Sequence, residues 1–156
     1  MVTNAPRVTF SRRLHLKASV SKMEATVTHL GGVQFEVNVR GHKIYSDQPA
    51  AAGGFDEAPT PPELLLASLG ACAAYYAAEY LRVHRLSEEN LHVHVHAEKS
   101  FKPARLSSFR IEVDAPAAAT EQHRAGITKA VERCLIHNTL LHPPQIEIAV
   151  PIPATI

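Results

Sequence analysis

A long predicted helix between Thr60 and His84 constrains this chain more than any other segment. Its start is well marked, because Thr60 can cap the helix, Pro61 suits the first helical position, and Glu63 completes a Thr-x-x-Glu capping box. The segment is also dense in small residues, which are Ala67, Ser68, Gly70, Ala71, Ala73, Ala74, Ala77 and Ala78. Because small side chains let a neighbouring helix or strand approach closely, we expect other elements to pack tightly against this helix.

Most of the remaining chain alternates apolar and polar residues, which is the pattern of half-buried strands. The strands predicted in this way span residues 8–20, 23–30, 33–40, 42–47, 91–101, 108–116 and 145–152. The pairs Gly31-Gly32 and Arg40-Gly41 are typical of turns, so the strands between residues 23 and 47 are expected to form an antiparallel meander.

Two further segments complete the predicted order of elements. Residues 48–59 carry Pro, Gly and Ala without any period, so we expect a loop there. A second amphipathic helix is expected over residues 118–140 and is ended by Pro143-Pro144. Strands, helix, strands, helix and strand follow one another without regular βαβ alternation, which predicts an α+β fold with two central helices packed against antiparallel sheet.

The composition argues against several classes of function. The formal net charge is +1, with 16 basic and 15 acidic residues, so neither a nucleic-acid-binding surface nor a membrane-surface patch is indicated. No apolar run approaches the roughly 20 residues of a bilayer span, and the first residues lack the hydrophobic segment of a secretory signal. No nucleotide-binding glycine loop or serine-nucleophile elbow is present. We expect a single-domain cytoplasmic protein without a cofactor.

The 2 cysteines, Cys72 and Cys134, are each expected on the inward face of one of the two predicted helices. A free cysteine is most often a small buried hydrophobe, and burial makes its thiol unreactive. If the helices cross, however, the sulfur atoms can come within bonding distance, which requires Cα atoms about 4.4–6.8 Å apart. Because static disulfides are rare in a reducing cytosol, such a pairing is expected to be transient and part of the function.

A row of histidines is the second feature with possible chemistry. His92, His94 and His96 alternate along one predicted strand, so all three project from the same face. Paired imidazoles of this kind can share a zinc or copper ion. The apolar residues between them already supply the buried face of the strand, which favours a solvent-facing row without a metal.

Two single residues have alternative interpretations. His137 lies one helical turn after Cys134, where its imidazole can lower the thiol pKa or carry a proton, or can simply be a hydrogen-bonded histidine near the surface. Arg12 is the charged residue on the apolar side of the 8–20 strand. It either protects a sheet edge as an inward-pointing charge or delivers a guanidinium to a buried thiolate.

Both cysteines lie in sequence segments that resemble the signature segments of the OsmC/Ohr family, and more narrowly of its OsmC-like branch. The segments are PTPPELLLASLGACAA around Cys72 and ERCLIHNTLLHPPQIEI around Cys134. The leading segment MEATVTHLGGVQFEV, followed by Asp-Gln-Pro and a Gly-Gly loop, is similar in order and spacing. The resemblance covers about residues 23–152, so we divide the chain into an extension over 1–22, interpreted as an added strand, and an OsmC-like domain over 23–156.

This resemblance implies an obligate homodimer of intertwined chains that reduces organic hydroperoxides in oxidative-stress defence. Cys72 would then be the peroxidatic thiolate, which becomes a sulfenic acid, and Cys134 would resolve it as a disulfide. An external dithiol would restore the pair. The alternative is a protein of the same fold that binds a small apolar ligand and has little or no peroxidase activity.

The chain departs from the family pattern at the residues that activate the thiol. Peroxidases of this family carry a glutamate ten residues before the attacking cysteine, paired with an arginine from the N-terminal strands. Here Pro62 occupies that position, and LGGVQFEV has no arginine. The candidates that remain for activating the thiol are Arg12, Arg40, His137 and Glu63.

Overall fold

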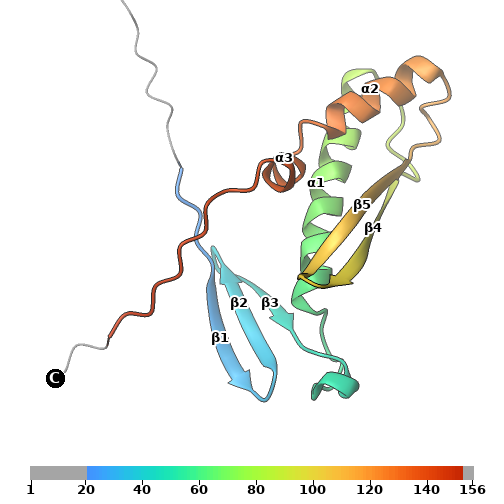
Figure 1. The fold of residues 1–156 in the computed structure, drawn as a ribbon. Helices are drawn as coiled ribbons and strands as arrows, with labels where there is room; N and C mark the ends of the chain where they lie inside the picture. Colours follow the sequence, from blue (N-terminus) through green and yellow to red (C-terminus); the bar gives the residue numbers. More distant parts are fainter. Residues whose placement is uncertain (1–20, 153–156) are drawn as a thin grey trace, which may run out of the picture.

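The structure is a computed structural model that describes residues 21–152 (Figure 1). The strands are β1 (Thr26–Gly31), β2 (Gln34–Val39), β3 (His42–Ser46), β4 (His92–Phe101) and β5 (Ala104–Asp114). The helices are α1 (Pro61–Val83), α2 (Glu121–Val131) and α3 (Leu135–Leu141), with a single 3-10 turn, η1 (Ala50–Ala52). This is the predicted α+β arrangement, and the strand expected at 8–20 lies outside the described residues.

The strands form two antiparallel sheets. The first has the order β1-β2-β3, which confirms the predicted meander, and Arg40 and Gly41 form its second turn with positive φ angles of 53° and 85°. The second sheet consists of β4 paired with β5. Figure 1 shows β4 and β5 beside α1, whereas the three-stranded sheet extends beyond the start of α1.

Helix α1 carries the core of the molecule on a stripe of residues four apart. Leu69, Ala73, Ala77 and Leu81 are all buried, and α1 contacts β4, β5, α2 and α3. The close approach expected from the small residues is present at Gly70, where a Cβ atom would lie 3.2 Å from a methyl group of Val95 on β4. The apolar side chains packed around this stripe come from β4, β5 and α2, and include Val93, Ile111, Val113, Ile127 and Val131.

Helix α1 is also long and apolar enough to cross a membrane by length and composition, which the sequence reading did not anticipate. In this structure its core stripe packs against a sheet and another helix. Those contacts are typical of a central helix in a globular domain.

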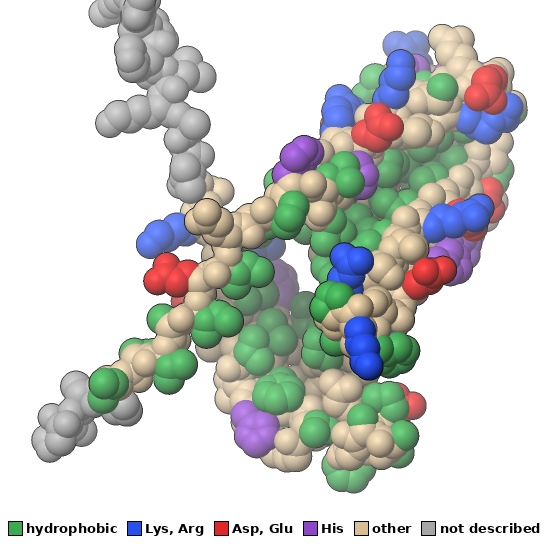
Figure 2. Space-filling model, viewed as in Figure 1, with side chains coloured by type: hydrophobic (Ala, Val, Ile, Leu, Met, Phe, Trp, Pro, Cys, Tyr) green, Lys and Arg blue, Asp and Glu red, His purple; other side chains and the backbone are tan. Residues whose placement is uncertain are grey.

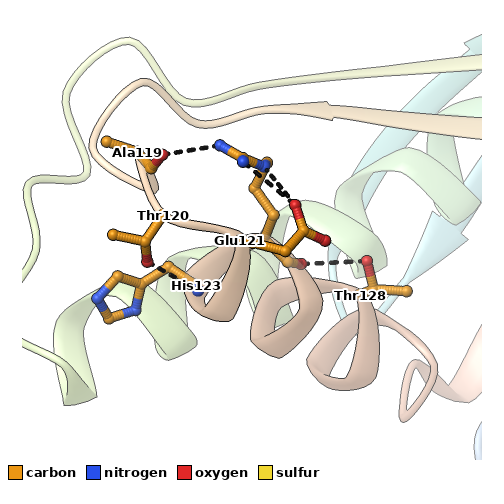
Figure 3. Close-up of polar contacts among 6 residues, drawn as sticks. Ala119, Thr120, Glu121, His123 and Thr128 are labelled. Atoms are coloured by element: carbon orange, nitrogen blue, oxygen red, sulfur yellow. Dashed lines mark hydrogen bonds and ion pairs between the residues drawn. The ribbon is translucent and has the colours of Figure 1, made fainter.

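The single helix expected over residues 118–140 is wrong, because the chain forms two helices with a break at residues 132–134. The first of them, α2, begins where Thr120 accepts a hydrogen bond from the backbone N–H of His123 at 3.2 Å (Figure 3). At the break, Cys134 has an extended backbone with ψ of 128° and acts as the N-cap of α3. Cys134 therefore lies between two helices rather than within one.

The predicted closing strand over residues 145–152 is also absent as a sheet element. The segment runs away from the body of the chain, and its apolar side chains, Ile146, Ile148, Val150 and Ile152, are 84–92% exposed (Figure 2). A strand forms only against an edge that offers free backbone N–H and C=O groups. Within the described residues this segment has no such neighbour, so it forms no strand despite its alternating pattern.

The loop over residues 47–59 is fixed by one buried carboxylate at its start. Asp47 accepts hydrogen bonds from the backbone N–H groups of Gln48 (2.8 Å), Phe55 (3.0 Å) and Glu57 (3.2 Å), and from the side chain of Gln34 (3.4 Å). Burial by itself raises the pKa of Asp47, but these hydrogen bonds outweigh it and hold the pKa below its ordinary value. The loop leads directly into α1, so Asp47 helps to position that helix.

We predict that Asp47→Asn lowers the midpoint of thermal unfolding by several degrees at neutral pH. The folded-state pKa of Asp47 lies below the unfolded-state value, so its contribution to stability is full above about pH 4 and is lost as the pH falls through the folded-state pKa. The difference between wild type and Asp47→Asn, measured by thermal melts across this range, should therefore shrink in acid.

Asp56→Asn is the matched control, because Asp56 is an exposed carboxylate in the same loop. A constant difference between wild type and Asp47→Asn at all pH values would contradict the assignment.

Candidate active site

The two cysteines form a disulfide that joins the middle of α1 to the break between α2 and α3. Their Cα atoms are 5.8 Å apart, within the range that a disulfide requires. The close approach of the two sulfur atoms, which the sequence left open, is therefore present in the structure. Cys72 is half-buried and Cys134 is fully buried, so Cys72 is the more accessible of the two.

The backbone around Cys134 is held by side chains and by the first turn of α3. The Cys134 sulfur accepts a hydrogen bond from the backbone N–H of His137 at 3.4 Å. The side-chain amide of Asn138 donates to the carbonyl oxygens of Glu132 and Cys134, both at 3.1 Å. The first of these bonds gives the Glu132 carbonyl a partner at the break, and the Cys134 carbonyl also accepts the backbone N–H of Asn138 at 3.0 Å.

On α1, Cys72 begins a second stripe of side chains four residues apart. Tyr76, Tyr80 and His84 follow it on the same face. The stripe meets the break and α2 along its whole length: the Arg133 guanidinium carbon lies 5.9 Å from the centre of the Tyr76 ring, and the Tyr80 hydroxyl lies 3.2 Å from Nδ1 of His123.

Close packing at Tyr80 fixes how α2 lies on α1. A Cβ atom at Gly126 would overlap the Tyr80 ring, so only glycine fits where α2 passes Tyr80. On its other side the Tyr80 ring stacks on His84, with ring centres 4.0 Å apart. This crossing sets the direction in which α2 delivers Cys134 to Cys72.

Of the four residues considered as thiol activators, the structure places only His137 beside the cysteine pair. Arg12 lies outside the described residues. Arg40 is at the exposed β2–β3 turn, in the sheet that extends beyond the start of α1. Glu63 accepts hydrogen bonds from the Thr60 backbone N–H (2.7 Å) and hydroxyl (2.8 Å), which lower its pKa.

Glu63 therefore forms the predicted capping box. Nine residues of helix also separate it from Cys72 of the same chain, which corresponds to about 13 Å along the axis.

Arg133 is the residue near the site that sequence reasoning missed. It directly precedes Cys134, and its guanidinium lies over Tyr76, one turn beyond Cys72. Its position next to a cysteine was the only available signal, because an exposed arginine in a helical pattern is normally a solvated surface residue.

A cavity of about 1030 Å³ lies between β5, α2 and α3. Its walls are mostly apolar, with contributions from Leu69, Phe109, Ile111, Ile127 and Leu140 (Figure 2). His137 also lines it, although the Nδ1 atom of its ring is itself buried and has no hydrogen-bond partner among the described residues. Neither cysteine lines the cavity, which approaches the pair through Leu69, three residues before Cys72, and through Glu132 and His137 on either side of Cys134.

The histidine row faces solvent, as the alternation predicted. His92, His94 and His96 are all exposed on the outer face of β4. Across the part of the chain that the structure describes, no three or more His, Cys, Asp or Glu side chains are grouped so as to hold a metal ion.

Solved structures with the same fold are numerous, and the three described below are distant in sequence. An OsmC-like protein from Mycoplasma pneumoniae has a TM-score of 0.68 and 19% identity, covering 79% of this chain and 89% of that one. An organic hydroperoxide resistance protein from Elizabethkingia anophelis, with thiocyanate bound, has a TM-score of 0.60 and 20% identity, covering 78% and 89%. Identities this low establish a common fold only.

A third structure has a small molecule in its active site. It is a candidate organic hydroperoxide resistance protein from Vibrio cholerae, with captopril bound in one of the active sites. Its TM-score is 0.57 at 19% identity, covering 80% of this chain and 88% of that one.

Comparison of the sequence itself gives the family. None of the curated protein sequences is similar enough to match the chain. The OsmC-like protein family matches residues 54–149, which is more than half of the chain and includes both cysteines. Together with the shared fold, this match shows that the chain belongs to the OsmC-like protein family.

Proposed function

We propose that this protein reduces organic hydroperoxides through Cys72 and Cys134, in defence against oxidative stress. The observation that carries the proposal is the pairing of the two cysteines across α1 and the α2–α3 break, with Cα atoms 5.8 Å apart. A pair at this separation can pass between dithiol and disulfide without large backbone movement. Distant relatives of the same fold are named organic hydroperoxide resistance proteins, which supports the same chemistry.

The reaction divides into three balanced steps. The Cys72 thiolate attacks one oxygen of the peroxide, an S–O bond forms as the O–O bond breaks, and the released alkoxide takes a proton and leaves as an alcohol. The Cys134 thiol then attacks the sulfenic acid sulfur, which forms the disulfide and releases water. An external dithiol finally reduces the disulfide by exchange and is itself oxidised. Because this last step needs a reductant, we place the protein in the reducing cytoplasm.

The assignment of roles follows from accessibility. Cys72 is half-buried, whereas Cys134 is fully buried, and the attacking sulfur must meet the substrate. The neighbouring cavity has apolar walls, which suits a hydroperoxide with a hydrocarbon body.

We predict that Cys72→Ser abolishes consumption of cumene hydroperoxide in the presence of a dithiol. Cys134→Ser should still form the sulfenic acid once, because the attacking sulfur remains, but should lose most of its steady-state rate. The measurements are peroxide loss over time and trapping of sulfenic acid by mass spectrometry. Equal rates for wild type and Cys72→Ser would refute the proposal.

A second function is favoured by the same cavity. Its volume of about 1030 Å³ is at the upper end for small-ligand sites, and its walls are mostly apolar. The protein would then bind a small apolar ligand and turn over peroxide slowly or not at all. Mass spectrometry of the protein purified under native conditions distinguishes the two functions, since an apolar molecule retained by a protein without peroxidase activity would support binding.

We also propose that the protein works as a homodimer. The outer face of α1 exposes Ala67, Ala71 and Tyr75, and the segment 145–152 exposes a row of apolar side chains. Contiguous apolar surface of this kind usually marks an interface. A second copy can cover both the helix face and the segment, which would give that segment the strand neighbour that it lacks.

We predict that the wild-type protein is a dimer by size-exclusion chromatography with light scattering at micromolar concentration. Ile148→Glu places a charge on the apolar side of the 145–152 segment and should shift the protein towards monomer. Glu147→Gln changes the opposite side of the same segment and should leave the dimer intact. A monomeric wild type would contradict this part of the proposal.

A further inference from the structure

Arg133 supplies positive charge next to the cysteine pair, and the segment LGGVQFEV, where the family's arginine would be expected, contains none. We infer that Arg133 is the positioning residue that favours the thiolate form of Cys72, an inference that rests on the peroxidase function proposed above. Cys72 must lose its proton to attack a peroxide, and a nearby cation stabilises the thiolate over the thiol.

The geometry brings the guanidinium to Tyr76, which lies one helical turn beyond Cys72. The Arg133 guanidinium carbon lies 5.9 Å from the centre of the Tyr76 ring. Tyr76 follows Cys72 by four residues on the same face of α1, which is a rise of about 6 Å. Arg133 is also the direct chain neighbour of Cys134, whose sulfur is bonded to that of Cys72. The contact with Tyr76 and the position next to Cys134 therefore place Arg133 near the pair.

The charge of Arg133 is not neutralised by a carboxylate within the described residues. By contrast, Arg82, Arg110 and Arg124 each form an ion pair with a glutamate, which is Glu88, Glu112 and Glu121 respectively. The aromatic face of Tyr76 orients the Arg133 guanidinium without cancelling its charge.

Other ionisable groups lie close to Arg133. Glu79 of α1 and Lys129 of α2 border the same small pocket as Arg133, with opposite charges. Glu132, which precedes Arg133 in the break, lines the large cavity with His137 of α3. Arg133 differs from these groups because its guanidinium lies over Tyr76, which is on the same face of α1 as Cys72.

The test uses thiol titration, so that it does not depend on peroxidase activity. In the Cys134→Ser protein, the absorbance of the thiolate at 240 nm and the rate of alkylation by iodoacetamide are followed against pH. Arg133→Gln should lower the thiolate fraction at neutral pH by about three- to tenfold, which corresponds to a pKa raised by up to about one unit. Arg133→Lys should restore part of the effect, because the charge is kept while the planar stacking is lost.

Lys129→Gln is the matched control, since Lys129 is a positive charge on the adjoining helix α2 that borders the same small pocket as Arg133. An unchanged Cys72 titration in Arg133→Gln would overturn the inference, and so would an equal shift in Lys129→Gln. The two proposals fail separately. If the Cys72 titration shifts in Arg133→Gln but the wild type does not consume peroxide, the role of Arg133 is retained and the peroxidase function is rejected. If the wild type consumes peroxide but the titration does not shift, the peroxidase function is retained and the role of Arg133 is rejected.

Discussion

Close packing around α1 is the constraint on which the rest of the structure depends. Leu69, Ala73, Ala77 and Leu81 are buried against β4, β5 and α2, and small residues let these elements approach the helix axis. A second contact, between Tyr80 and Gly126, fixes where α2 passes over the helix. Cys134 reaches Cys72 only because both contacts hold α2 at one height along α1. The pairing of the cysteines therefore depends on packed side chains that are not themselves reactive.

Local sequence patterns were sufficient to predict the caps, turns and strands that form through interactions between residues close in sequence. The capping residues at Thr60 and Glu63, the turns at Gly31-Gly32 and Arg40-Gly41, and the alternation in β4 all appear where the sequence placed them. The break before Cys134 was not predictable in this way, because residues 129–137 contain neither proline nor glycine and keep a helical pattern. Contacts distant in sequence, the bond to Cys72 among them, hold that break.

The residues of the site divide in the same way, into those that a local sequence pattern identifies and those that depend on contacts distant in sequence. Both cysteines were identifiable from their sequence segments, but their separation was not, since it depends on how α2 crosses α1. Glu63 was correctly explained as a cap. Arg133 could not be singled out, because only the packing of the break on Tyr76 distinguishes it from other exposed arginines. The pattern over 145–152 was read correctly as apolar on one side, but its pairing partner does not lie within the described residues.

The two stripes on α1 also determine the direction, around the helix axis, in which the Cys72 sulfur points. The core stripe of Ala73, Ala77 and Leu81 and the stripe of Cys72, Tyr76 and Tyr80 are offset by one residue, which is about 100° around the helix. The contacts that hold the core stripe against β4 and β5 therefore also turn the second stripe towards the break. Inserting one residue between positions 72 and 73 would keep the spacing of Ala73, Ala77 and Leu81 but would turn the Cys72 sulfur by a further 100° relative to them, away from Cys134. The angular position of the cysteine is thus set by the packing of Ala73, Ala77 and Leu81, which are not themselves reactive.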